Sequence, residues 1–185
     1  MGKFTEIDAK LRDFIAQQQI FFVATAAPEG RVGLAPKGMD SLRVLAPKRV
    51  VWLNLTGSEN ETAAHLLESP RMSLMWCSFT AKPLILRVYG KARAIHPRDP
   101  DWAELLGLFP SLAGARQILD VAVEAVLTSC GFGVPRYDFV AQRPTLVQLL
   151  EEKGEAWVED YWANRNTTSL DGKPTGIFGN SAEEP

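Results

Sequence analysis

Hydrophobic residues in the first hundred positions are grouped in short runs separated by turn-forming residues. These runs are rich in Val, Leu and aromatic residues, which is typical of β-strands. They lie at 20–26, 31–35, 41–47, 49–55, 71–79 and 84–95. Pro28 to Gly30 lies between the first two runs and Pro47-Lys48 between the next two, which predicts two antiparallel hairpins. A further strand is predicted at 120–129, where apolar residues alternate with Glu124 and Thr128.

Helices are predicted at the start of the chain, at one place between the strands and after residue 96. Ile7, Leu11, Phe14 and Ile15 fall on one side of an amphipathic helix predicted over 5–18. Other helices are predicted at 60–68, 101–109, 114–119 and, as one or two helices, 145–165. Only one short helix interrupts the strands before residue 96, so the strands cannot form βαβ units. We therefore expect an α+β protein whose antiparallel sheet curls into a barrel.

The chain has 185 residues, which suits one domain with a substantial core. We expect residues 1–166 to form that single domain, including the C-terminal helices. Residues 167–185 are polar and contain Gly and Pro, and we expect them to form a tail that is mobile or lies on a partner.

Charge and composition restrict the possible functions. The 20 basic and 22 acidic residues give a net charge of −2, which argues against a partner that is nucleic acid or a membrane surface. The first residues are too charged for a signal peptide, and no apolar run is long enough to span a membrane. With two cysteines and two isolated histidines, His65 and His96, we expect a cytoplasmic protein without a disulfide framework or a zinc site.

The stretch NLTGSENETAAHLLESP (54–70) leaves an apolar strand and enters a short helix. Ser58 and Glu61 have the spacing of a capping box, in which each side chain binds a free backbone amide at the helix start. Such a turn also directs backbone N–H groups and the positive end of the helix dipole toward one point, which suits a phosphate. From these residues alone, a plain helix cap and a phosphate site both remain open.

Three stretches together resemble the flavin-binding split barrels related to pyridoxamine 5′-phosphate oxidase. They are FFVATAAPEGRVGLAPKG, SLRVLAPKRVVWLNLTGSENETAAHLLESPRMSLMW and LRVYGKARAI, which cover roughly residues 18–96. Family features correspond here to Arg43 on a strand, Leu53-Asn54 at a strand end, the turn 58–62, Ser69-Pro70 and Gly90. The resemblance implies a six-stranded antiparallel split β-barrel with flanking helices.

The same resemblance implies that FMN binds at the interface of a homodimer, with basic and hydroxyl side chains holding its phosphate. The candidate cofactor-binding residues are Lys37, Arg43, Leu53, Asn54, Ser58, Asn60, Glu61, Thr62, Arg87 and Cys130. Glu59 and Glu61 stand where the oxidase has basic residues, so Lys37 and Arg43 are the expected partners of the phosphate. Trp157, Tyr161 and Trp162 form an aromatic group that would need cover, which also favours a homodimer.

Without the family, these candidates have ordinary structural explanations. Lys37 would be an exposed loop lysine, and Arg43 and Arg87 would be solvated charges on strand faces. Cys130 would be a small buried hydrophobic side chain. Each explanation stays open from the residues alone.

The C-terminal region departs from the oxidase. The oxidase binds its substrate with a C-terminal arginine and histidine segment, and nothing in QRPTLVQLLEEKGEAWVEDYWANRN (142–166) matches that segment, so we do not expect vitamin oxidation. Three functions remain: an FMN-dependent oxidoreductase that passes electrons between reduced nicotinamide and a small-molecule substrate; a protein that binds flavin, deazaflavin or haem without turnover; and an interaction protein without cofactor. No acid/base constellation is recognisable in the sequence to decide between the first two.

Overall fold

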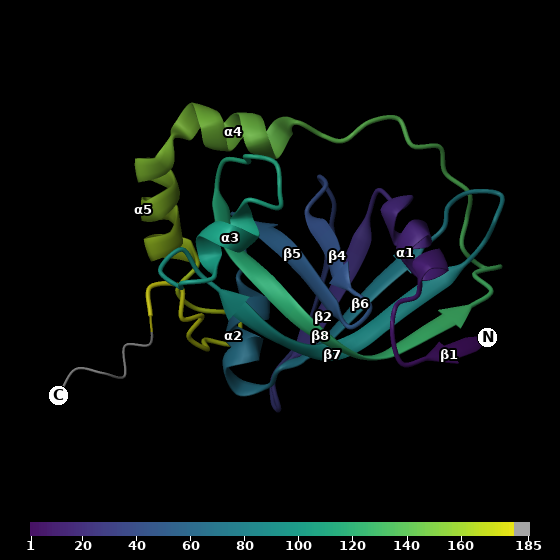
Figure 1. Cartoon of the computed structure of the whole chain (residues 1–185). Helices are drawn as coiled ribbons and strands as arrows, with labels where there is room; N and C mark the ends of the chain where they lie inside the picture. The colour runs from purple at the N-terminus through teal and green to yellow at the C-terminus, as the bar shows by residue number, and fades with distance from the viewer. Residues whose placement is uncertain (180–185) are drawn as a thin grey trace.

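One antiparallel sheet dominates the computed structural model, which describes residues 1–179 (Figure 1). Its strands are β1 (Gly2–Phe4), β2 (Phe21–Ala26), β3 (Val32–Lys37), β4 (Leu42–Ala46), β5 (Arg49–Leu55), β6 (Arg71–Cys77), β7 (Ile85–Ile95) and β8 (Ala115–Ser129). Hydrogen bonds join them in the order β3-β2-β6-β7-β8-β5-β4, and β1 pairs with β8. Strands β3 and β4 therefore lie at the two ends of the path.

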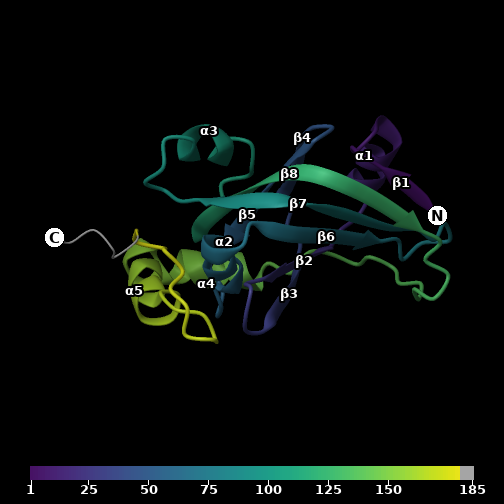
Figure 2. The same ribbon diagram turned by 90° about the horizontal axis from the view of Figure 1, so that it is seen from below.

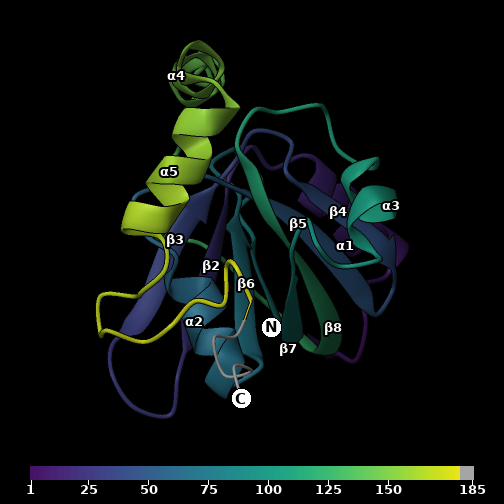
Figure 3. The ribbon, with the colours of Figure 1, turned by 90° about the vertical axis from the view of Figure 1, so that its left-hand side faces the viewer.

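Five helices flank the sheet. They are α1 (Ala9–Ala16), α2 (Glu61–Glu68), α3 (Trp102–Leu106), α4 (Thr145–Lys153) and α5 (Glu155–Arg165). Seen from the end of the molecule that carries the C-terminal helices, α4 and α5 lie on one side and α3 lies on the opposite side (Figure 3). The view from below separates α3 from α5 in the same way (Figure 2). No helix within residues 1–179 is long and apolar enough to cross a membrane.

The predicted α+β class and antiparallel sheet are confirmed, and so are both hairpins. Phe21 pairs with Lys37 in the β2–β3 hairpin, and Leu42 pairs with Trp52 in the β4–β5 hairpin. The sheet has eight strands rather than six. One unexpected strand is β1, whose three residues are too short to give an alternating pattern.

The helix predicted at 114–119 is wrong, because these residues begin the long strand β8. Residues Arg116 to Leu119 are all buried, so this part of the strand has no exposed side and its side chains do not alternate between apolar and polar. A short buried strand of this kind cannot be distinguished from a helix by periodicity.

Apolar side chains from both faces of the curled sheet form the core. The larger cluster contains Trp52, Leu74, Trp76, Leu86 and Val126, each at most 1% exposed, and α1 covers it with Leu11 and Ile15. Close backbone approach requires glycine at position 90, where β7 and β8 change register. A Cβ atom on Gly90 would come within 2.1 Å of the Ala122 carbonyl oxygen.

Residues 167–179, the described part of the predicted tail, pack against the body of the protein. Thr175 and Ile177 are buried there, and Arg98 donates hydrogen bonds to the carbonyls of Gly176 and Ile177 at 2.7 and 2.6 Å. Lys173 forms an ion pair with Glu68 of α2 at 2.6 Å. The rest of the predicted tail, residues 180–185, lies outside the described residues.

Candidate functional site

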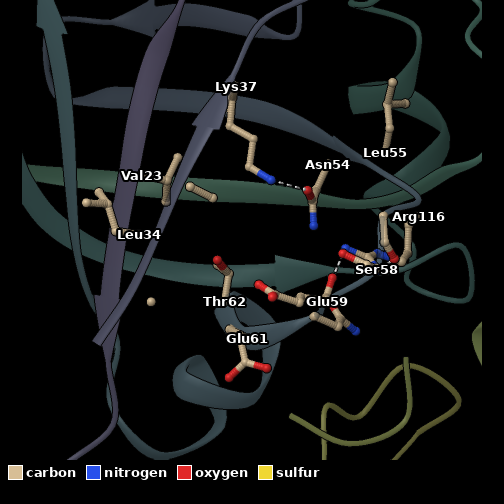
Figure 4. Close-up of a pocket in the computed structure, with 14 residues that line it drawn as sticks. Val23, Leu34, Lys37, Asn54, Leu55, Ser58, Glu59, Glu61, Thr62 and Arg116 are labelled. Carbon is tan, nitrogen blue, oxygen red and sulfur yellow. Dashed lines mark hydrogen bonds between the residues drawn. The ribbon is translucent and has the colours of Figure 1, made fainter. Parts of the chain in front are cut away.

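A cavity of about 190 Å³ lies where β3, the end of β5 and the start of α2 meet (Figure 4). The turn 56–60 between β5 and α2 forms one side of it. The lining side chains include Lys37 from β3, Asn54 from β5, and Ser58, Thr62 and Arg116. This set contains two cationic groups, Lys37 and Arg116, which belong to different strands but line the same cavity.

The start of α2 forms part of the cavity wall without a side-chain cap. Helix α2 begins at Glu61 with Asn60 as its N-cap residue, and no side chain makes a capping hydrogen bond there. The predicted capping box is therefore wrong: the Glu61 carboxylate instead accepts a hydrogen bond from the Leu170 amide at 2.7 Å. Amides in the first turn of a helix have no partner within the helix, so the start of α2 remains able to bind an anion.

Lys37 is the last residue of β3, and its side chain extends into the cavity. Its Nζ atom donates a hydrogen bond to Asn54 Oδ1 at 3.1 Å and lies 5.4 Å from the centroid of the Trp52 ring. Burial, with a smaller contribution from the charge of Arg116, lowers the pKa of the Lys37 ammonium to about 8, while Glu59 opposes the shift. At neutral pH the side chain is still mostly protonated.

A β-bulge places Arg116 at the cavity. Asn54 pairs with Gln117 and Leu55 pairs with Ala115, so Arg116 is an extra residue of β8 between two pairs. Such a residue can direct its side chain away from the regular strand pattern. The Arg116 guanidinium donates to Asn166 Oδ1 at 2.7 Å and to the Glu59 carbonyl at 3.0 Å.

Arg116 is a buried cation whose partners are all neutral groups. The residue is 2% exposed, its Nε atom has no hydrogen-bond partner within residues 1–179, and no carboxylate of these residues lies within 4 Å of it. Burial lowers the pKa of the guanidinium to about 10, so it stays charged at neutral pH. A buried charge is costly unless an opposite charge compensates it, so this arrangement favours an anionic ligand.

Comparison with known proteins places the chain in a family. The family model described as pyridoxamine 5′-phosphate oxidase matches residues 7–130, which include Lys37, Arg116 and the turn 56–60. The chain belongs to the pyridoxamine 5′-phosphate oxidase family. A relative from Aspergillus flavus, the pyridoxamine 5′-phosphate oxidase family protein ustO, is 35% identical over 192 residues that cover 92% of this chain and 76% of the relative.

Solved structures agree with this family assignment at the level of the fold. A candidate pyridoxamine 5′-phosphate oxidase from Lactobacillus delbrueckii is 17% identical, covers 69% of this chain and 99% of its own, and has a TM-score of 0.55. HupZ from Group A Streptococcus is 18% identical, covers 67% of this chain and 94% of its own, and has a TM-score of 0.53. At these identities the likeness shows the fold alone, the split barrel that the sequence predicts.

Six of the ten candidate residues predicted from the resemblance to this family come together at the cavity. They are Lys37, Asn54, Ser58, Asn60, Glu61 and Thr62. Leu53 is next to them in sequence but lies in the hydrophobic core, and its neighbour Leu55 lines the cavity instead. The six residues at the cavity belong to β3, to the end of β5, and to the turn 56–60 and the start of α2.

The structure does not bring the other three candidates to the cavity. The Arg43 guanidinium pairs with both carboxylate oxygens of Asp40 at 2.7 and 2.9 Å and lies 5.1 Å from the Phe109 ring centroid. Arg87 donates to Ser129 Oγ at 3.1 Å, and Cys130 is exposed after the end of β8. Arg43 thus has a counter-ion of its own, unlike Arg116.

Sequence analysis missed Arg116, although it lies within the residues that match the pyridoxamine 5′-phosphate oxidase family. The sequence predicts a helix at 114–119, and an arginine on a helix is ordinarily solvated. A strand over 115–129 would have given a useful signal, since Arg116 and Gln117 are then polar residues in a strand that is otherwise largely apolar. The bulge that orients Arg116 has no signature in the sequence.

Proposed function

We propose that the protein binds FMN, with the phosphate held between Lys37, Arg116 and the first turn of α2. The observation that carries this proposal is the buried Arg116 guanidinium, which has neutral partners and an unpartnered Nε atom in the described part of the chain. Membership of the pyridoxamine 5′-phosphate oxidase family supports a flavin as the source of the phosphate.

The residues at the cavity fit a phosphate dianion. Lys37 and Arg116 supply two positive charges, and the hydroxyl groups of Ser58 and Thr62 line the same space. A dianion between the two cations would offset the burial cost of Arg116 and favour the protonated form of Lys37. The Glu61 carboxylate binds the Leu170 amide and lies on the side of the cavity away from Lys37, which reduces its repulsion of a phosphate near Lys37 (Figure 4).

The cavity is too small for a whole flavin. Its volume of about 190 Å³ is below the 300–1,000 Å³ of ordinary small-molecule pockets, so it suits the phosphate end alone. We propose that a second copy of the chain supplies the remaining wall. Strand β3 supports this, because it lies at an end of the sheet path and exposes Val32 and Leu34, which are 71% and 68% accessible.

The expected activity is electron transfer between reduced nicotinamide and a small acceptor. A bound flavin supplies the hydride and electron transfer chemistry, and the chain binds and orients it. Haem is a weaker candidate because its iron needs an axial ligand, and the buried histidines, His65 and His96, do not line the cavity. The protein is not expected to oxidise pyridoxamine 5′-phosphate, because residues 142–166 contain no match to the arginine and histidine segment with which the oxidase binds that substrate.

Spectroscopy of the purified protein tests this proposal. We expect flavin absorbance in the protein as isolated, and stronger binding of FMN than of riboflavin by the protein stripped of cofactor. Equal affinity for FMN and riboflavin would contradict the phosphate site, since the two differ by the phosphate alone. Steady consumption of NADH or NADPH would then separate an oxidoreductase from a protein that only binds flavin.

A further inference from the structure

Asn166, in the C-terminal region, forms hydrogen bonds with residues that line the cavity. It follows the last residue of α5 and is 0% exposed. Its side-chain oxygen accepts the hydrogen bond from Arg116, and its side-chain nitrogen donates to the Gly57 carbonyl at 3.1 Å. One side chain therefore binds both the buried cation and the turn 56–60.

Two more contacts hold the same turn from the C-terminal region. Asn60 Nδ2 donates to the main-chain oxygen of Asn166 at 3.2 Å. The indole N–H of Trp162, one turn earlier on α5, donates to Thr56 Oγ1 at 2.8 Å. Residues at the start, near the start and at the end of the turn 56–60 are thus all anchored to α5 and the residue that follows it.

The amide of Asn166 has the donor and the acceptor that its two partners need. The guanidinium of Arg116 requires an acceptor, and the Gly57 carbonyl requires a donor. A carboxylate at position 166 would also accept from Arg116, but it would neutralise the guanidinium charge and face the Gly57 carbonyl with an acceptor. Asparagine therefore holds the guanidinium in place and leaves its charge uncompensated.

We propose that Asn166 is a positioning residue that makes the cavity selective for a phosphate-bearing flavin, an inference that rests on the proposed function. It fixes the direction of the Arg116 guanidinium and the shape of the turn 56–60, and its neutrality leaves the positive charge for the ligand. The match to the family model ends at residue 130, so this contribution comes from a part of the chain beyond it.

Affinities of the full-length protein without cofactor for FMN and for riboflavin test the proposal. Asn166→Asp is expected to lower the ratio of the two affinities by about tenfold or more, because Arg116 is then paired internally. Asn166→Ala removes the positioning contacts without adding a charge, and its ratio is expected to fall by a smaller factor. Asn164→Asp is the matched control, since it makes the same change at an exposed position of α5 whose side-chain amide donates to Asp160.

The ratio of affinities separates the possible results. If the parent protein binds FMN no better than riboflavin, the proposed function fails. If the parent prefers FMN and both Asn166 variants keep the same preference, the inference about Asn166 is overturned. A loss of affinity for both ligands by equal factors also overturns it, because a purely structural role weakens the whole site. Should Asn166→Asp fail to fold, the ratio for Asn166→Ala decides alone.

Discussion

The Lys37 ammonium and the Arg116 guanidinium share one cavity, and the charge of Arg116 helps to lower the pKa of Lys37 to about 8. The two strands that carry them, β3 and β8, are far apart in the order of the sheet. A ligand with two negative charges would relieve their repulsion, and this relationship underlies the first two predictions.

Replacement of either cation is expected to weaken binding of FMN more than binding of riboflavin. Charge-assisted hydrogen bonds contribute roughly 1.5–3 kcal/mol each, so Arg116→Met or Lys37→Met should cost about tenfold to a hundredfold in FMN affinity. Fluorescence titration of the protein stripped of cofactor measures both affinities. Arg43→Met separates the two possible positions of the phosphate: a loss with this variant but not with Arg116→Met would place the phosphate near Arg43.

Affinity for FMN is expected to fall as the pH rises above 8. The free protein loses the proton of Lys37 near pH 8, whereas a bound phosphate would favour the protonated form and raise this pKa. Affinity should therefore decrease with a slope approaching tenfold per pH unit between pH 8 and 9. Titrations at pH 7, 8 and 9 check this, with riboflavin as the comparison ligand. A slope that persists in Lys37→Met would assign the effect to another group.

The protein is expected to be a homodimer that depends on strand β3. Val32 is 71% exposed on this strand, and Val32→Asp should shift the protein toward the monomer and weaken FMN binding, because a charge there opposes burial. Analytical ultracentrifugation at micromolar concentration measures the change. Leu45→Asp on β4, at the other end of the sheet path, is the matched control. A parent protein that is monomeric with FMN bound would contradict the prediction.

The aromatic side chains from which the sequence predicts a homodimer are largely covered within one chain. Trp157 stacks on Tyr161 with ring centroids 5.0 Å apart, and the indole of Trp162 binds Thr56. All three side chains are only partly exposed. The reason to expect a second copy therefore moves from α5 to β3.

Stability is expected to decrease in mild acid because of His96. Burial lowers the pKa of this histidine from 6.5 to about 4, and the charge of Arg98 contributes. The unfolded chain then binds a proton between pH 6.5 and 4 that the folded protein does not, so the free energy of unfolding falls as the pH falls through this range. The loss should be on the order of 2 kcal/mol by pH 4.5.

Urea unfolding at pH 7 and pH 4.5 measures this loss. Carboxylates also titrate in the range, so the informative quantity is the difference between the parent protein and His96→Gln. The variant should lose less stability on acidification than the parent does. Equal losses would show that His96 is not responsible.

Much of the fold follows from local patterns, and part of the site does not. In the β2–β3 and β4–β5 hairpins, a turn that contains proline joins the two strands. The composition of these strands is distinctive over a few residues. The turn 56–60 follows from its small polar residues and from the family resemblance. Arg116 and Asn166 contribute through contacts across 50 residues of sequence, and one of them sits on a bulge. Neither the long-range contact nor the bulge can be predicted from the types of the neighbouring residues.

The capping box shows a second limit of local patterns. Ser58 and Glu61 have the right spacing, but the helix starts at Glu61 and its carboxylate binds the amide of Leu170. The Glu61 carboxylate thus binds the C-terminal segment instead of a backbone amide at the start of its own helix. This outcome depends on the tertiary structure, which a motif of four residues cannot report.

The contact between Asn166 and Arg116 can form only late in the synthesis of the chain. A nascent chain that has reached residue 130 already contains Lys37, Arg116 and the turn 56–60, but it lacks Asn166, which binds Arg116 and the turn. The residue that holds Arg116 is added 50 positions later, and the segment that binds α2 follows it. If Asn166 positions Arg116 for FMN as we propose, the chain becomes able to bind FMN only after the strands of the sheet have been made.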